Sequence, residues 1–96
     1  MNTNSNALKV TKHLQAKLEE IFKTLKYAVR YEKGTFKSGH CIIEDRNNIV
    51  INKFYPLESK VNALVEILRV INPDLSALQP AQAKLVRRLN QTELKF

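Results

Sequence analysis

The feature that most constrains this chain is a broad apolar stripe between two prolines. Apolar residues recur at helical spacing over 57–71, and Ile67 and Val70 widen the stripe beyond one narrow face. Pro56 suits the first turn of a helix, and Asn72-Pro73 ends it because the residue before proline avoids the α region. We therefore predict a helix over 57–71 that is the central packing element of the fold.

Three segments before this helix have the composition of β-strands. Residues 27–32 alternate between two faces, 36–44 follow as a second strand, and 49–54 are rich in β-branched residues. Gly34 can take the positive φ that a tight hairpin needs, and 45–48 carry the Asp and Asn side chains typical of turns. Short loops favour pairing between consecutive strands, so we predict a three-stranded antiparallel meander.

Helices are predicted at both ends of the chain. An apolar stripe predicts a helix from about residue 7 to about residue 25, and 76–79 have the spacing of a capping box before a last helix of about 12 residues. Region 72–80 fits a loop, a short helix or part of that last helix. We expect a two-layer α+β fold with an N-terminal helix, the meander, and one or two C-terminal helices. Residues 1–6 are predicted to be a disordered tail, and 7–96 a single domain.

Composition limits the classes of protein to which the chain can belong. Its 96 residues include 16 basic and 9 acidic side chains, a net charge of +7. This excess favours anionic partners, although it also lies within the range that keeps a small domain soluble. Cys41 is the single cysteine, and no signal peptide or membrane span is recognisable. We predict a cytoplasmic protein.

Catalytic and metal-binding patterns are weak. His40 and Cys41 are adjacent, but neighbouring strand residues point to opposite faces, so Cys41 is better explained as a small buried hydrophobe than as a thiolate nucleophile. His13, His40 and Cys41 lack the spacing of a zinc site, and Gly34 and Gly39 do not form a phosphate loop. We predict no catalytic, cofactor or metal site, and a non-enzymatic role.

Nucleic-acid binding is one alternative function. Basic and aromatic side chains interleave around the first predicted hairpin, where they would neutralise phosphates and stack on unpaired bases. A basic cluster in the last predicted helix would extend that surface. The candidate residues are Arg30, Tyr31, Lys33, Phe36 and Lys37 in the hairpin, and Lys84, Arg87 and Arg88 in the helix.

A protein-interaction module, self-associating as a homodimer, is the interpretation that the sequence favours. A short meander leaves open sheet edges, and the strand 49–54 has apolar residues on both faces. The broad helix 57–71 adds further apolar surface. The candidate interface residues are Ile49, Ile51, Phe54, Ile67 and Val70.

Two segments resemble a known group of sequences. Residues 30–44, which read RYEKGTFKSGHCIIE, and residues 52–58, which read NKFYPLE, resemble a group of small bacterial proteins that carry no assigned function. The resemblance covers roughly the middle half of the chain. It implies a cytoplasmic bacterial protein, and it carries no catalytic residues to transfer.

Overall fold

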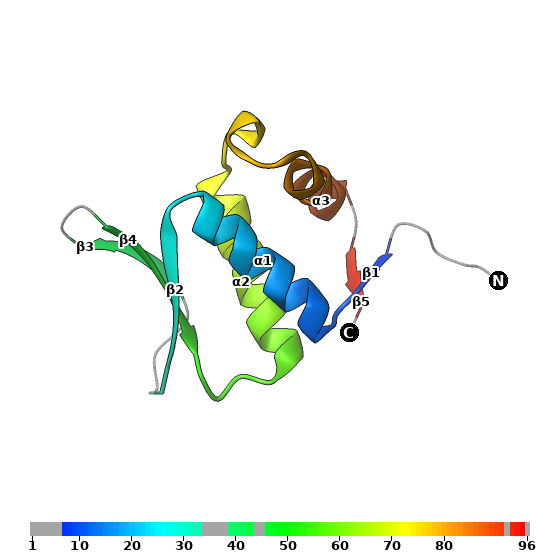
Figure 1. Ribbon diagram of the computed structural model, residues 1–96. Coiled ribbons are helices and arrows are strands. Elements are labelled where there is room, and N and C mark those ends of the chain that lie inside the picture. The colour runs from blue at the N-terminus through cyan, green and yellow to red at the C-terminus, as the bar shows by residue number, and fades with distance from the viewer. Residues whose placement is uncertain (1–6, 34–38, 44–45, 92, 96) are drawn as a thin grey trace.

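The computed structural model of the protein describes residues 7–33, 39–43, 46–91 and 93–95, and these form a mixed helix and strand fold (Figure 1). The elements in chain order are β1 (Ala7–Lys9), α1 (Lys12–Thr24), β2 (Tyr27–Glu32), β3 (Gly39–Ile43), β4 (Arg46–Asn52), α2 (Leu57–Ile71), the short 3-10 helix η1 (Leu75–Ala77), α3 (Pro80–Gln91) and β5 (Glu93–Lys95). None of the described helices is both long and apolar enough to cross a membrane.

The three longer strands form one mixed sheet with the order β2-β4-β3. β3 and β4 are antiparallel, whereas β2 pairs with β4 in parallel, with Val29 opposite Ile49 and Tyr31 opposite Ile51. The predicted antiparallel meander is not confirmed, because β4 rather than β3 lies next to β2. The predicted hairpin turn at Gly34 lies outside the described residues.

The strand order follows from the burial of β4. Ile49 and Ile51 of β4 are fully buried. The central strand of a sheet offers the deepest burial, because both of its edges are paired and the helices lie directly above it. β2 carries the exposed Arg30 and the half-buried Glu32, which suit an edge because charged side chains there remain solvated. The burial of the β4 isoleucines thus outweighs the loop-length preference for consecutive pairing.

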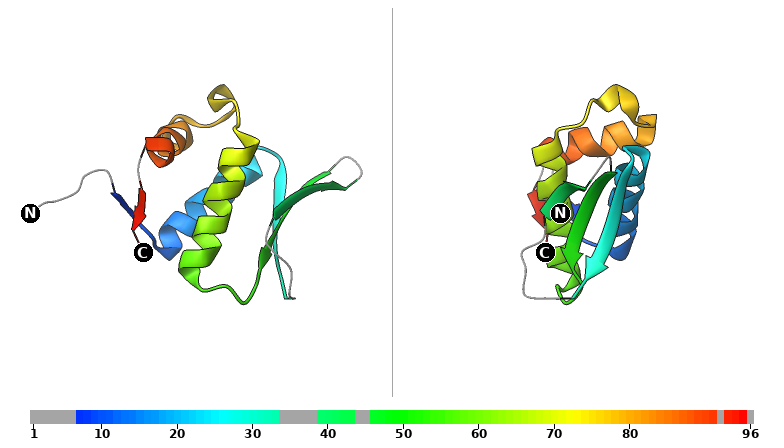
Figure 2. Two further views of the ribbon diagram at one scale, coloured as in Figure 1. Left: turned by 180° about the vertical axis from the view of Figure 1, so that it is seen from behind. Right: turned by 90° about the vertical axis from the view of Figure 1, so that its left-hand side faces the viewer.

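Helices α1 and α2 cover one face of the sheet, and no described helix covers the other (Figure 2). Their facing side chains form the core together with Ile49 and Ile51. Burying each of these side chains stabilises the fold by about 1.5–3 kcal/mol. The fully or almost fully buried helix residues are Leu14, Leu18, Ile21 and Phe22 in α1, and Val61, Leu64, Val65 and Leu68 in α2.

Helix α3 lies on the side of α1 and α2 that faces away from the sheet (Figure 1). Val86 and Leu89 are buried there, and the Arg69 guanidinium of α2 donates to the carbonyl oxygen of Leu89 over 3.0 Å. The side-chain amide of Gln82 also donates to the Thr24 hydroxyl at the end of α1, over 3.0 Å. The fold therefore has three layers where two were predicted.

The N-terminal helix is shorter than predicted. Thr11 is its N-cap, and the Thr11 hydroxyl accepts a hydrogen bond from the Leu14 amide over 3.0 Å, so that α1 begins at Lys12. The residues before it form β1, which pairs in parallel with β5 from Ala7 opposite Glu93 to Lys9 opposite Lys95. The pairing uses backbone groups, which a side-chain pattern does not reveal.

The two later helices match the sequence analysis closely. α2 spans the predicted 57–71, and its C-cap Asn72 has a left-handed backbone (φ 48°, ψ 63°), a conformation that Asn tolerates better than most residues. α3 has 12 residues and begins at Pro80. Its first turn is capped by Gln82, whose side chain accepts from the Gln79 amide over 3.0 Å, rather than by the predicted pair Ser76 and Gln79.

The strand order can be tested by cross-linking. In a Cys41→Ser background, we expect Arg30→Cys with Val50→Cys to form a disulfide on mild oxidation, because the two residues are opposite each other on adjacent strands. An antiparallel meander would separate them by two strand spacings, roughly 10 Å. Mass spectrometry of the unreduced digest detects the link. The matched control is Ala28→Cys with Val50→Cys, a pair displaced by two residues, which should stay reduced. Free thiols in the Arg30→Cys and Val50→Cys pair would contradict the strand order β2-β4-β3.

Candidate functional site

One edge of the sheet presents backbone groups that no strand in the described part of the chain uses. β2 pairs with β4 on one side, and no described strand pairs with its other side. The Glu32 carbonyl accepts from the Lys53 amide over 2.7 Å, so the backbone of Glu32 points toward β4. Backbone direction alternates along a strand, so Ala28 and Arg30 also point toward β4, while Val29 and Tyr31 point away. The amides and carbonyls of Val29 and Tyr31 make no hydrogen bond within the described residues.

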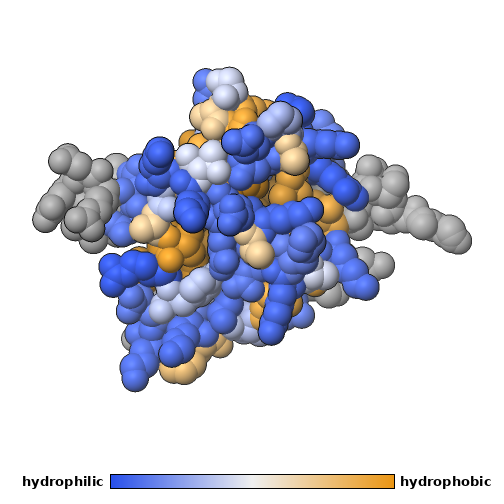
Figure 3. Space-filling model, in the orientation of Figure 1, coloured by the Kyte–Doolittle hydropathy of each residue, from blue (hydrophilic) through white to orange (hydrophobic). Residues whose placement is uncertain are grey.

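Helix α1 borders this edge and forms a groove with it. The groove has a volume of about 360 Å³ and lies between α1 and β2. Figure 3, which shows this side of the molecule, has apolar surface between the two elements, enclosed by hydrophilic side chains. The lining residues are Glu19 and Lys23 of α1, and Tyr27, Ala28, Val29 and Tyr31 of β2.

A tight connection holds the two walls of the groove together. α1 ends at Thr24, and β2 begins three residues later after Lys26, which has a left-handed backbone (φ 70°). The Phe22 and Tyr27 rings meet edge to face, with centroids 6.2 Å apart and an interplanar angle of 71°. Because Phe22 is fully buried, the start of β2 is fixed against the core.

A polar cluster lies at the other end of the groove. The Tyr31 hydroxyl donates to the Glu19 carboxylate and accepts from the side-chain amide of Gln15 over 2.9 Å. The Lys60 ammonium of α2 lies 5.5 Å from the centre of the Tyr31 ring, a cation–π contact. Burial, and then the hydrogen bond to Glu19, raises the pKa of Tyr31 to about 12. The Tyr31 hydroxyl therefore keeps its proton well above neutral pH, and its two hydrogen bonds and the Lys60 contact place the ring at the end of the groove.

Those predicted nucleic-acid residues that the structure describes do not form one surface. Arg30 and Lys33 are exposed, and Arg30 pairs with Glu32 over 2.9 Å. Tyr31 is half-buried in the cluster described above, and Phe36 and Lys37 lie outside the described residues. The basic residues Lys84, Arg87 and Arg88 are exposed on α3, and the layer of α1 and α2 separates that helix from the sheet (Figure 1).

The predicted interface residues are also dispersed. Ile49, Ile51 and Ile67 lie in the core. Phe54 and Val70 are exposed, at 70% and 71% of their surface, but Phe54 precedes α2 and Val70 lies at its end. At 1.5 Å per residue the two are separated by roughly 20 Å along the helix. These five residues therefore do not build a continuous apolar patch.

Of the residues weighed for thiol or metal chemistry, His13 is exposed on α1, and His40 and Cys41 lie in β3. The backbones of His40 and Cys41 pair with Ile49 and Asn48 of β4, and their side chains lie outside the described part of the structure. Across the described residues no group of three or more His, Cys, Asp or Glu side chains is arranged to hold a metal ion.

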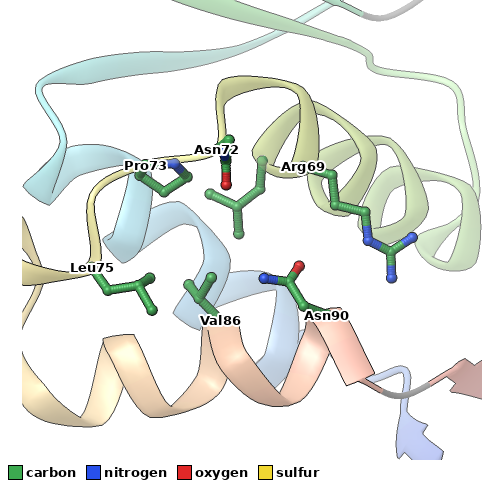
Figure 4. Close-up of a pocket in the computed structure, with 7 residues that line it drawn as sticks. Arg69, Asn72, Pro73, Leu75, Val86 and Asn90 are labelled. Atoms are coloured by element: carbon green, nitrogen blue, oxygen red, sulfur yellow. The ribbon is translucent and has the colours of Figure 1, made fainter.

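A second, smaller cavity of about 230 Å³ lies between the end of α2 and α3 (Figure 4). Its apolar lining comes from Leu68, Leu75 and Val86, and the amide of Asn90 points into it. The Arg69 side chain turns toward the end of α3, where it donates to the Leu89 carbonyl. This cavity is a packing feature at the joint of two helices.

Comparisons with known proteins do not identify a relative. No protein-family model, curated protein or solved structure matches the chain. The groove between α1 and β2 was not predicted from the sequence. The alternation in 27–32 was the available signal, because it predicted a strand with one exposed face, but it could not reveal which neighbour β2 would have.

The edge geometry predicts an alternating pattern of amide hydrogen exchange. We expect the amides of Val29 and Tyr31 to exchange at least about tenfold faster than those of Ala28 and Arg30, because only the latter pair bonds to β4. Residue-resolved exchange followed by NMR measures this directly. Equal protection of all four amides would mean that another segment covers the edge.

The Tyr31 cluster predicts a specific pH dependence. The pKa of Tyr31 rises from 10.0 to about 12 on folding, so between these values the unfolded chain loses a proton that the folded chain keeps. Stability present below pH 10 should therefore fall as the pH rises toward 12. We expect this loss to be smaller in Tyr31→Phe than in the unchanged protein, as measured by urea denaturation at pH 9 and pH 11. Tyr55→Phe is the control, and equal losses in all three proteins would contradict the assignment.

Proposed function

We propose that this protein is a non-enzymatic interaction module that binds an extended segment of another protein by strand addition to β2. The observation that carries the proposal is the unbonded backbone of Val29 and Tyr31 on an edge that borders the α1 groove. An added strand bonds such backbone groups and places alternate side chains into the adjacent groove. Affinity then comes from the backbone, and selectivity comes from the groove.

The size of the site supports a transient interaction. Each backbone hydrogen bond contributes about 0.5–1.5 kcal/mol net, and Val29 and Tyr31 together offer two donors and two acceptors. Burial of side chains in the groove adds to this, while ordering of the bound segment opposes it. An interface made of one added strand falls at or below the lower limit for stable complexes, about 1,200 Å². We therefore expect affinities on the order of micromolar.

The position of α1 behind β2 also limits how two copies of the chain could pair. The homodimer stays a prediction. α1 lies directly behind β2 (Figure 2), and paired strands are about 4.8 Å apart, whereas packed helices need about 8–10 Å. Two copies joined by their β2 strands would therefore force their α1 helices too close. An extended segment without a covering helix fits this edge better than the same edge of a second copy.

Nucleic-acid binding also stays a prediction, with less geometric support. Its proposed stacking residue Tyr31 is held by Glu19 and Gln15, and the two basic groups lie on opposite sides of the helical layer. A bound peptide and an oligonucleotide are distinguishable, because only the peptide would depend on the Val29 backbone.

The proposal predicts that one backbone change weakens binding. Peptides selected from a displayed library of random 12-residue sequences should bind the unchanged protein and lose at least about tenfold in affinity for Val29→Pro, which removes an outward amide. Val29→Thr keeps the amide and the β-branched shape, and should retain binding. Fluorescence anisotropy measures the affinities, and circular dichroism checks that both variants fold.

A change in the peptide tests the same point without altering the protein. N-methylation of the selected peptide at successive positions should weaken binding at alternate residues only, because only every second amide faces β2. The proposal is wrong if no peptide is selected, or if N-methylation has the same effect at adjacent positions.

A further inference from the structure

We infer that the segment bound at β2 is acidic, with Asp or Glu side chains beside the start of β2 and an apolar side chain over Val29. The inference rests on the proposed function and specifies its partner: an extended peptide whose carboxylates meet a lysine-rich rim around an apolar groove. The rim is defined here as Lys23 and Lys26 at the start of β2 and Lys33 just after its end.

Among the described residues, no carboxylate forms an ion pair with the cations of this rim. Lys23 lines the groove, and Lys26 precedes the first residue of β2; both are exposed. Lys33 is exposed just beyond the other end of the strand. Arg30 forms an ion pair with Glu32, and none of the three rim lysines takes part in it. Positive charge at the groove is therefore available to a partner.

Two carboxylates, one in the groove and one at the end of β2, already accept hydrogen bonds. Glu19 accepts hydrogen bonds from Tyr31 and from Gln15, the latter over 3.4 Å, and Glu32 accepts from Arg30. Glu19 lines the groove one helical turn before Lys23 and retains its negative charge, so it partly offsets that lysine. Lys26 and Lys33 keep the two ends of the edge positive, which favours an acidic segment over a basic one there.

Side-chain alternation determines which residues of the added strand face the groove and which lie on the open face of the sheet. Residues of the added strand that oppose Tyr27, Val29 and Tyr31 share the groove side, and those between them lie beside Ala28 and Arg30 on the open face of the sheet. The groove position over Val29 is apolar, and the one by Tyr27 lies next to Lys23. The position beside Arg30 also favours a carboxylate, since a guanidinium has enough donors to bond Glu32 and a second acid.

The test is a pair of parallel selections from the same random 12-residue library. One selection uses the unchanged protein, and the other uses Lys23→Glu with Lys26→Glu. We expect the first pool to be enriched in Asp and Glu, and the second to lose that enrichment and gain Lys and Arg. Lys17→Glu with Lys84→Glu changes the net charge equally at positions away from the groove, and should give the acidic pool again.

Binding constants distinguish an error in the acidic preference from an error in the proposed strand addition. Peptides of the acidic pool should bind Lys23→Glu with Lys26→Glu at least about tenfold more weakly, and should weaken as salt rises from 0.1 to about 0.5 M. Identical charge composition in all three pools overturns the acidic preference. If those peptides still show the alternating N-methylation pattern, strand addition stands and the partner chemistry alone is wrong. The absence of any selected peptide overturns the proposed function itself.

Discussion

The burial of Ile49 and Ile51 beneath α1 and α2 is the constraint on which the rest of this structure depends. These side chains are fully buried in β4, and the helices that cover them carry the remainder of the core. Once β4 occupies the centre of the sheet, β2 has to lie at an edge, and α1, tied to β2 by a short connection, has to lie beside that edge. The candidate binding groove is therefore a direct consequence of how the core is filled.

Local features of the fold could be predicted well. The helix over 57–71 has the observed bounds because Pro56 and Asn72-Pro73 limit it through backbone sterics, which act within one or two residues. The alternation of 27–32 likewise coincides with β2. Features that depend on distant partners could not be predicted. The strand order depended on how deeply β4 is buried beneath the helices, and the pairing of β1 with β5 involves segments at opposite ends of the chain.

The candidate site shows the same division. Each residue type was visible in the sequence, but its role depended on its neighbours. Tyr31 has the appearance of a stacking residue when only Arg30 and Lys33 are considered. In the fold its hydroxyl is held by Glu19 and Gln15, which come from a separate helix. Val29 carries no chemical signal at all, because its importance lies in backbone groups whose direction only the strand order determines.

The pairing of β1 with β5 has a consequence for how the protein folds. Ala7 meets Glu93 across nearly the whole length of the chain, so this contact closes the longest loop in the molecule. The entropy lost in closing such a loop is offset only after the intervening helices have packed. We therefore expect the terminal strands to join late in folding and to separate first on unfolding. By contrast, α1 and β2 are contiguous in sequence, so we expect the contacts that build the groove to form early and to persist while the ends of the chain come apart.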